Sequence, residues 1–267
     1  MNKTTVSVIM SAYNCAPYIA EALESIINQT YSSWEFIICD DGSDDGTWDV
    51  IQSYKQKHLE KIITLRNKEN RKQAFSRNRC IQRAKGTYIA LMDADDLCDP
   101  SRLKKQVDYL ETHPEISFVG TAMTIFDENG EWGQNFSKPF VEPIDLIVGN
   151  GFIAASCMFR KDVLISIKGY RTDPRYYFVE DYELFQRLYV AGYRGANLQE
   201  PLYKYREYRQ TMERRRLRNR IHGAMLKARG INDFKLSSGL YIYVVRGVII
   251  GLLPPKLYRY LHRRKYS

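Results

Sequence analysis

Short apolar runs alternate with amphipathic stretches over the first 115 residues, and this alternation limits the possible folds more than any other feature. The apolar runs are residues 6–11, 34–39, 62–65 and 88–92. Between them, apolar side chains recur at the spacing of an α-helix in residues 16–27, 47–54 and 74–84. This order predicts an α/β fold, in which helices cover both faces of a mostly parallel sheet.

A further helix is expected after the fourth run. Asp99 has the side chain of an N-cap residue, Pro100 suits the first helical position, and Leu103, Val107 and Leu110 would share one face. We therefore expect this helix to begin at Pro100.

The pattern becomes irregular after residue 114, which indicates a second lobe. Strand-like stretches occur at 118–126 and 152–159, and Asn129-Gly130 is typical of a hairpin turn. Helical periodicity returns over 181–191. The expected organisation is a first subdomain at 1–115, a second fused to it at 116–210, and a C-terminal segment at 211–267.

The C-terminal segment combines positive charge with an apolar run. The chain has a formal net charge of +9, and its basic residues concentrate after residue 202 while the part before it is net acidic. The apolar run 240–253, followed by the basic run 256–265, is shorter than the roughly 20 residues that span a membrane. We expect it to lie on an anionic membrane surface; a helix packed on the body, with a solvated basic helix at 214–220, is the alternative.

Cysteine use and the N-terminus indicate a reduced, cytoplasmic protein. The five cysteines are odd in number and widely spread, without metal-ligand spacing. The apolar run behind Lys3 is too short for a signal peptide. No nucleic-acid partner is expected, because the basic residues accompany an apolar run rather than a nucleic-acid-binding motif.

Acidic residues follow the second and fourth apolar runs, where ligands settle in parallel sheets. These are Asp40-Asp41-Gly42-Ser43 and Asp93-Ala94-Asp95-Asp96. Carboxylates at the end of a buried strand are costly unless they are paired or bound to a cation, and oxygen ligands suit Mg²⁺ or Mn²⁺ bound to phosphates. Turn formation, helix capping or salt bridges are the structural alternatives.

A third acidic pair, Glu180-Asp181, opens the helix expected at 181–191. Acidic residues are common in the first turn of a helix, where they stabilise its dipole. A carboxylate beside a substrate hydroxyl could instead act as a general base.

Several motifs occur in the order found in one enzyme family. They are the opening strand Val6 to Asn14, the DDGS-x-D-G-T segment ending at Thr47, Arg77-Asn78, the G-x-Y-I-x-x-x-D-x-D-D run from Gly86 to Asp96, Ser156 to Arg160, Gly169-Tyr170, and Glu180 to Leu184 before Arg187. In this order, from about Val6 to Arg206, the chain resembles glycosyltransferase family two, the inverting enzymes with a GT-A fold.

The resemblance implies a role for each matching residue. Asp181 would be the catalytic base. Asp95, together with Asp93, would contact Mn²⁺ or Mg²⁺. The nucleotide-binding residues would be Ser11, Ala12, Tyr13, Asp41, Lys72, Arg77 and Asp93.

The chain departs from the family pattern at two positions. Lys72 stands where many members have glycine; it could reach uracil or phosphate, or be solvent-exposed. Tyr208 lies near the position of a frequent metal-binding histidine, so metal ligation from that segment is not expected.

These implications lead to a specific expectation. A nucleotide-sugar-binding subdomain and an acceptor-binding subdomain would transfer one hexose from a UDP-sugar to a saccharide linked to undecaprenyl diphosphate, in O-antigen, capsule or exopolysaccharide synthesis. The enzyme would lie on the inner face of the cell membrane. A Q-x-x-R-W motif, typical of processive synthases, is absent from the sequence.

Two other function classes remain open. A metal-dependent nucleotidyltransferase would also use an α/β sheet and carboxylates, but the residues after the first strand lack a glycine-rich phosphate loop. A non-catalytic membrane-peripheral binding protein would use only the C-terminal segment.

Overall fold

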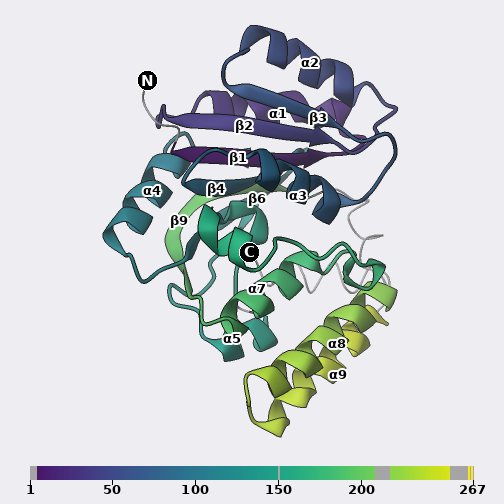
Figure 1. Cartoon of the computed structure of the whole chain (residues 1–267). Helices are drawn as coiled ribbons and strands as arrows, with labels where there is room; N and C mark the ends of the chain where they lie inside the picture. Colours follow the sequence, from purple (N-terminus) through teal and green to yellow (C-terminus); the bar gives the residue numbers. More distant parts are fainter. Residues whose placement is uncertain (1–4, 150, 208–216, 253–263, 265, 267) are drawn as a thin grey trace.

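The computed structural model describes the whole chain except residues 1–4, 150, 208–216, 253–263, 265 and 267. Four parallel strands in the order β3-β2-β1-β4 form the first part of its sheet (Figure 1). They are β1 (Val6–Ala12), β2 (Trp34–Asp40), β3 (Ile62–Arg66) and β4 (Tyr88–Asp93). The predicted parallel sheet is confirmed.

Helices cover both faces of this sheet because side chains along each strand alternate in direction. On β1, Val8 and Met10 pack with α1 (Ala16–Ile27), α2 (Thr47–Lys57) and α4 (Arg102–Thr112). Ile9 points to the other face, toward α3 (Gln73–Arg83), α6 (Lys161–Ser166) and α7 (Glu180–Val190). The layered α/β architecture follows directly from the period of the apolar residues.

The start of α4 differs from the prediction. The helix begins at Arg102 rather than Pro100, with Ser101 as its N-cap residue. Asp99 accepts hydrogen bonds from the backbone N and from Oγ of Ser101, at 2.8 and 2.5 Å. The Asp99 side chain therefore closes a turn just ahead of the helix instead of capping it.

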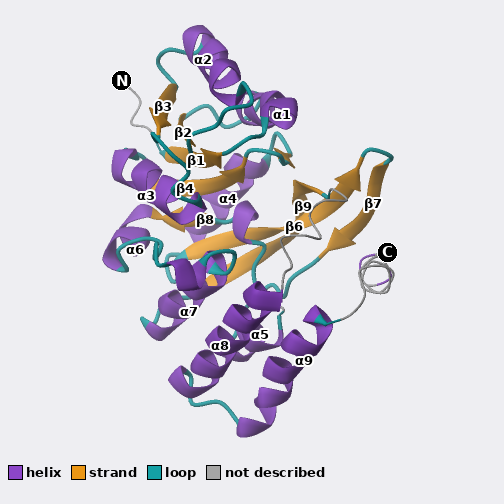
Figure 2. Cartoon of the chain, turned by 90° about the vertical axis from the view of Figure 1, so that its right-hand side faces the viewer, coloured by secondary structure: helices purple, strands orange, loops and turns teal. Residues whose placement is uncertain are grey.

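The second half of the chain continues the same sheet (Figure 2). Its strands are β5 (Leu97–Cys98), β6 (Phe118–Asp127), β7 (Gly130–Asn135), β8 (Met158–Arg160) and β9 (Gly195–Arg206). β8 joins β4 to β6 in antiparallel fashion, and β9 lies parallel to β6. The predicted hairpin turn at Asn129-Gly130 is confirmed, since it links β6 to β7.

The predicted strand at 152–159 is wrong for most of its length. Ala154–Ser156 form a 3₁₀ turn, and extended pairing starts only at Met158. The Ser156 hydroxyl accepts a hydrogen bond from the backbone N of Thr121 and donates one to the carbonyl of Ile153, at 3.0 and 2.8 Å. The bond to Ile153 is local and stabilises the turn, and it competes with strand pairing.

The described part of the C-terminal segment contains α8 (Leu217–Asp233) and α9 (Tyr241–Gly251). α8 packs against α7 and α5 (Pro143–Val148). Gln186 of α7 donates a hydrogen bond to the carbonyl of Leu226 at 2.8 Å. Gly230 permits the close approach, because a Cβ there would lie 2.5 Å from the Gln186 amide nitrogen.

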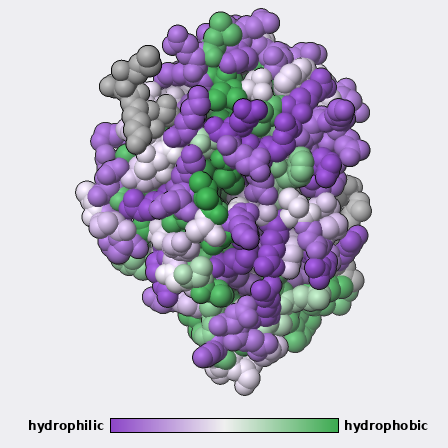
Figure 3. Space-filling view, in the orientation of Figure 1, coloured by the Kyte–Doolittle hydropathy of each residue, from purple (hydrophilic) through white to green (hydrophobic). Residues whose placement is uncertain are grey.

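α9 lies alongside α8 and leaves apolar side chains in solvent (Figures 1 and 2). Ile242, Val245 and Ile249 are 67%, 55% and 55% exposed. Figure 3 shows hydrophobic surface at the end of the molecule where α8 and α9 lie. None of the helices in the described ranges has the length and hydropathy needed to cross a bilayer.

Candidate active site

The carboxyl ends of β1, β2 and β4 meet at one edge of the sheet and bring the predicted nucleotide-binding residues together. Ser11 is in register with Asp93, and Ala12 with Asp40. Tyr13 follows with its side chain 48% exposed. An exposed aromatic ring beside this edge is available to a bound base, in the place predicted for the nucleoside.

Asp41 is buried and anchors the segment that leads into α3. Its carboxylate accepts four hydrogen bonds: from Asn67 Nδ2 at 2.6 Å, Ser76 Oγ at 3.0 Å, and the backbone N atoms of Arg71 and Lys72 at 2.9 and 2.8 Å. This network gives the rim of the predicted uracil site a defined shape.

Two unusual backbone conformations accompany this network. Gly42 has φ +77°, and a Cβ there would lie 2.9 Å from the backbone carbon of Glu69. Lys72 has φ 73° directly before α3. Its side chain is exposed while its N–H binds Asp41, so contact of its ammonium with a nucleotide stays a prediction.

Arg77 of α3 links two predicted site residues that are far apart in the sequence. Its guanidinium is buried and donates to Asp93 at 2.8 Å and to Asp181 at 2.6 Å. Tyr170 contributes its hydroxyl at 3.4 Å. Burial opposes the charge, but Asp181, Tyr170 and Asp93 raise the pKa of Arg77 above its ordinary value, so the side chain stays cationic.

In the structure, Arg77 therefore contacts protein carboxylates. These contacts do not test the predicted contact of Arg77 with the nucleotide, which stays a prediction. The ion pairs nevertheless bring Asp93, at the carboxyl end of β4, and Asp181, at the start of α7, to the two terminal nitrogens of one guanidinium.

Three carboxylates gather after β4. Asp96 is buried, and its pKa is raised by burial and by the charges of Asp95 and Asp93. It accepts hydrogen bonds from the Tyr203 hydroxyl and from the backbone N of Arg206, both at 2.8 Å. Asp96 therefore holds the end of β4 to β9, whereas Asp93 accepts hydrogen bonds from Arg77 and from Gln73 Nε2, at 2.8 and 3.1 Å.

The carboxylate oxygens of Asp93 and Asp95 are donors of the kind that a hard divalent cation prefers. Within the described residues, no group of three His, Cys, Asp or Glu side chains is arranged to hold a metal. Further ligands would come from diphosphate or water, as is usual for Mg²⁺. Tyr208, which we did not expect to bind metal, lies outside the described residues.

Asp181 also lines a pocket of about 360 Å³ between α7, α8 and the chain after α5. Its side chain is 31% exposed there. The neighbouring Glu180 is buried, and burial followed by the charge of Asp181 raises the pKa of Glu180 to about 7. One oxygen of Glu180, Oε2, has no hydrogen-bond partner in the structure.

Sequence reasoning missed one residue of this pocket, Lys227 of α8. It lies in a basic stretch that was interpreted as a solvated or membrane-facing surface. A signal was available only in the helical spacing of Ala224 and Ile231, seven residues apart, whose burial turns this face of α8 toward the body.

The sheet thus has carboxylates at its carboxyl edge, and α7 supplies a further carboxylate beside them through Arg77, an arrangement suited to a group-transfer enzyme. The family model for glycosyl transferase family 2 matches residues 7–167. The chain belongs to this family, as its motifs indicated, and is a glycosyltransferase with a GT-A-like fold. This assignment favours the predicted transferase over a nucleotidyltransferase.

Two curated relatives resemble the chain over nearly its whole length. It is 39% identical over 260 residues to the glycosyltransferase EpsE of Bacillus subtilis, covering 97% of this chain and 94% of EpsE. It is 29% identical over 246 residues to WfaP of Escherichia coli, a UDP-Glc:α-D-GlcNAc-diphosphoundecaprenol β-1,3-glucosyltransferase, covering 91% and 94%.

Solved structures share the fold. The mannosyltransferase PcManGT of Pyrobaculum calidifontis, in complex with GDP-Man and Mn²⁺, superposes with a TM-score of 0.69 at 21% identity. The match covers 95% of this chain and 72% of PcManGT. At this identity the likeness establishes the architecture.

Proposed function

We propose that the protein is an inverting hexosyltransferase that moves one hexose from a UDP-sugar to a saccharide linked to undecaprenyl diphosphate, in the synthesis of a bacterial surface polysaccharide. The observation that carries the proposal is the pair of Arg77 contacts, which bring Asp181 of the second lobe to the nucleotide end of β4. The likeness to WfaP supports both the UDP-sugar and the lipid-linked acceptor.

The donor would bind at the carboxyl edge of the sheet. Ser11, Ala12, Tyr13 and Asp41 would hold the nucleoside, with Lys72 near its base or phosphates. Asp93 and Asp95 would hold Mn²⁺ or Mg²⁺, as supported by their oxygen donors and by the Mn²⁺ complex of PcManGT. When bound, the cation would neutralise charge on the diphosphate leaving group.

Asp181 would take the proton from the acceptor hydroxyl. The acceptor oxygen then forms a bond to the anomeric carbon from the side opposite UDP, and the bond from that carbon to the diphosphate oxygen breaks. UDP leaves with the electron pair, so one in-line displacement inverts the configuration. Arg77 would keep the Asp181 carboxylate oriented, because its guanidinium binds the Oδ1 atom of Asp181 at 2.6 Å.

We also propose the roles expected for the three segments. Residues 1–115 would bind the nucleotide sugar, 116–210 the acceptor, and 211–267 the inner surface of the cytoplasmic membrane. The exposed apolar side chains of α9 support the last role, since Ile242, Val245 and Ile249 are 67%, 55% and 55% exposed. The basic run 256–265, also part of this proposal, lies almost entirely outside the described residues.

The membrane role is tested with vesicles that contain anionic lipids. Wild-type protein should co-sediment with them at low salt, and the double variant Ile242→Ser/Ile249→Ser should remain in the supernatant while keeping its circular dichroism spectrum. Equal sedimentation of both proteins would contradict a role of α9.

The catalytic proposal is tested by UDP release from a panel of UDP-sugars with Mn²⁺ or Mg²⁺, with and without a short-chain analogue of GlcNAc-diphosphoundecaprenol. One donor should give acceptor-stimulated release. Asp181→Asn should bind UDP like wild type but lose transfer by about 10²–10⁴-fold, the usual contribution of a general base. Asp95→Asn should instead weaken metal-dependent UDP binding. An equal loss of UDP affinity in both variants would refute these roles.

A further inference from the structure

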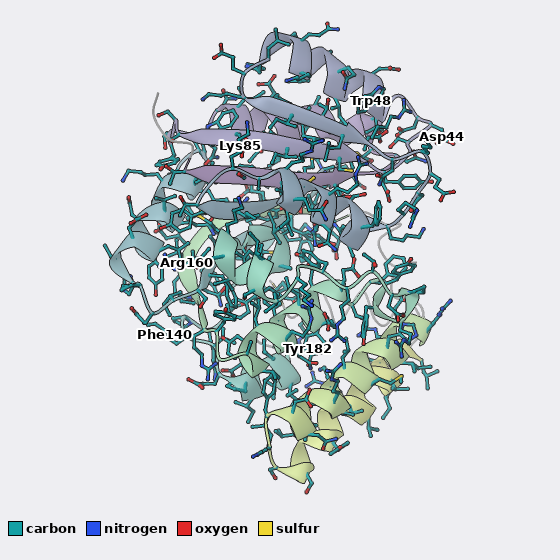
Figure 4. All side chains as sticks on the ribbon, viewed as in Figure 1. Asp44, Trp48, Lys85, Phe140, Arg160 and Tyr182 are labelled. Carbon is teal, nitrogen blue, oxygen red and sulfur yellow. The ribbon has the colours of Figure 1, made fainter. Side chains whose placement is uncertain are left out.

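The pocket beside Asp181 combines a carboxylate, aromatic rings and a cation. Its wall includes Asp181 and Tyr182 of α7, Phe185 one turn further along, Phe152 after α5, and Lys227 of α8 (Figure 4 labels Tyr182). The volume of about 360 Å³ lies within the range of small-ligand sites. The pocket is therefore large enough for a sugar and has both polar and apolar walls.

Within the part of the chain that the structure describes, no ion pair or hydrogen bond holds the ammonium of Lys227, and the carboxylate in the same pocket, Asp181, pairs with Arg77 instead. Burial, followed by the charges of Arg246 and Arg220, lowers the pKa of Lys227 to about 8. The ammonium is thus still largely protonated at pH 7, partly removed from water and repelled by these two arginines. Such a site attracts an anion, which would restore the lost solvation.

Phe178 gives the pocket a second unusual feature. Its ring is 60% exposed, although it is apolar, and its backbone has φ 67°, a strained conformation for a bulky residue. Phe178 and Val179 both line the pocket. A ligand that covers this ring would bury apolar surface that the protein alone leaves in water.

A ligand that fits these features is a ring with apolar faces that carries a hydroxyl at one position and an anionic group at another. We propose that this pocket binds the acceptor sugar, with its ring against the aromatic side chains and its phosphoryl group at Lys227. The inference rests on the proposed function, to which it adds that the phosphoryl group of the acceptor is itself recognised. Asp181, in the same pocket, would meet the acceptor hydroxyl.

Gly223 of α8 allows a second, independent test of ligand binding in the pocket. A Cβ at this position would meet only Val179 Cγ1, at 3.9 Å, so the first atom of a side chain can be added without a clash. A leucine would project into the pocket and occupy it. It would also improve the helix propensity at this position, so the variant should fold.

The experiment compares two acceptors that differ only in charge: a GlcNAc alkyl diphosphate and the corresponding neutral GlcNAc alkyl glycoside. Transfer kinetics and direct calorimetric binding in the presence of UDP are measured for wild type, Lys227→Met, Lys227→Arg and Gly223→Leu. Arg218→Met is the matched control, because it removes one positive charge from an exposed position of the same helix.

Lys227→Met should raise KM and Kd for the diphosphate about tenfold or more, as expected for loss of a charge-assisted contact, with kcat and UDP affinity near wild type. Its values for the neutral glycoside should not change, and Lys227→Arg should restore most of the preference. Gly223→Leu should weaken both acceptors, and Arg218→Met neither.

Equal effects of Lys227→Met on both acceptors, or none on either, would overturn the inference. If wild-type protein transfers to neither acceptor from any UDP-sugar, the proposed function fails, and the binding titration still decides the inference. Diphosphate binding that Lys227→Met weakens would support the site, whereas binding independent of Lys227, or no binding, would refute it.

Discussion

Replacing Arg77 by methionine should lower both the stability of the protein and its rate of sugar transfer, because the substitution removes both ion pairs of the guanidinium. Methionine keeps the apolar volume of the side chain but removes the guanidinium that binds Asp93 and Asp181. Breaking a buried ion pair typically costs about 3–5 kcal/mol, because the remaining charge loses its partner. Here the two carboxylates are 26% and 31% exposed and can recover part of their hydration from water. We therefore expect the lower end, about 3 kcal/mol.

The assay is thermal and urea-induced unfolding, followed by circular dichroism. For a chain of this size, about 3 kcal/mol corresponds to a fall in Tm of about 6–12 °C. Arg83→Met is the matched control, since it removes the same charge from an exposed position on the same helix. Its effect should stay within about 0.5 kcal/mol.

The same variant distinguishes the proposed role of Arg77 in orienting Asp181 from a role in binding UDP. At a temperature where Arg77→Met is folded, transfer should fall more than UDP affinity, because Asp181 depends on Arg77 for its orientation whereas the nucleoside site also has Asp41 and β1. If Arg77→Met matched Arg83→Met in both Tm and transfer rate, the buried ion pairs could not hold the site together, and the reasoning would be refuted.

Three further predictions concern stability. Burial, with the charge of Asp181, raises the pKa of Glu180 from an ordinary 4.5 to about 7, so the unfolded chain releases this proton at lower pH than the folded one. Stability should therefore fall as pH rises from 5 to 8, and Glu180→Gln should flatten this dependence in Tm measurements; parallel curves would contradict the assignment. Gly42→Ala should destabilise by about 2 kcal/mol in urea unfolding, because φ +77° is unfavourable for alanine and its Cβ would lie 2.9 Å from Glu69. Asp41→Asn should cost about 1–3 kcal/mol and weaken UDP binding, since an amide cannot accept all four hydrogen bonds; an unchanged urea midpoint would show that the network contributes little.

Much of the fold could be predicted because its signals are local. The helix at 16–27 was predicted with the bounds of α1, and the four parallel strands were predicted within one residue at each end. Both errors, at the start of α4 and at 152–159, involve side chains that bond to the backbone. Asp99 and Ser156 have hydroxyl or carboxylate groups that form turns in place of regular structure, and periodicity does not register such bonds.

The candidate site was predictable only in part. Residues after β2 and β4 were placed at one edge because parallel strands all end on the same side. The interaction of Arg77 with Asp181 could not be derived in this way, because these residues are brought together by how the second lobe folds over α3. Lys227 was missed because a basic helix looks the same in sequence whether it faces solvent, membrane or a pocket.

The sequence by itself determined the alternation of strands and helices, the family, and which carboxylates end the central strands, since each depends on spacing within a short segment. The tertiary structure alone decided that one buried guanidinium of α3 joins β4 to α7, and that α8 turns Lys227 toward the pocket of Asp181. The physical reason is that the charge and burial of a group depend on residues that topology brings near it, whereas periodicity reports only on neighbours along the chain.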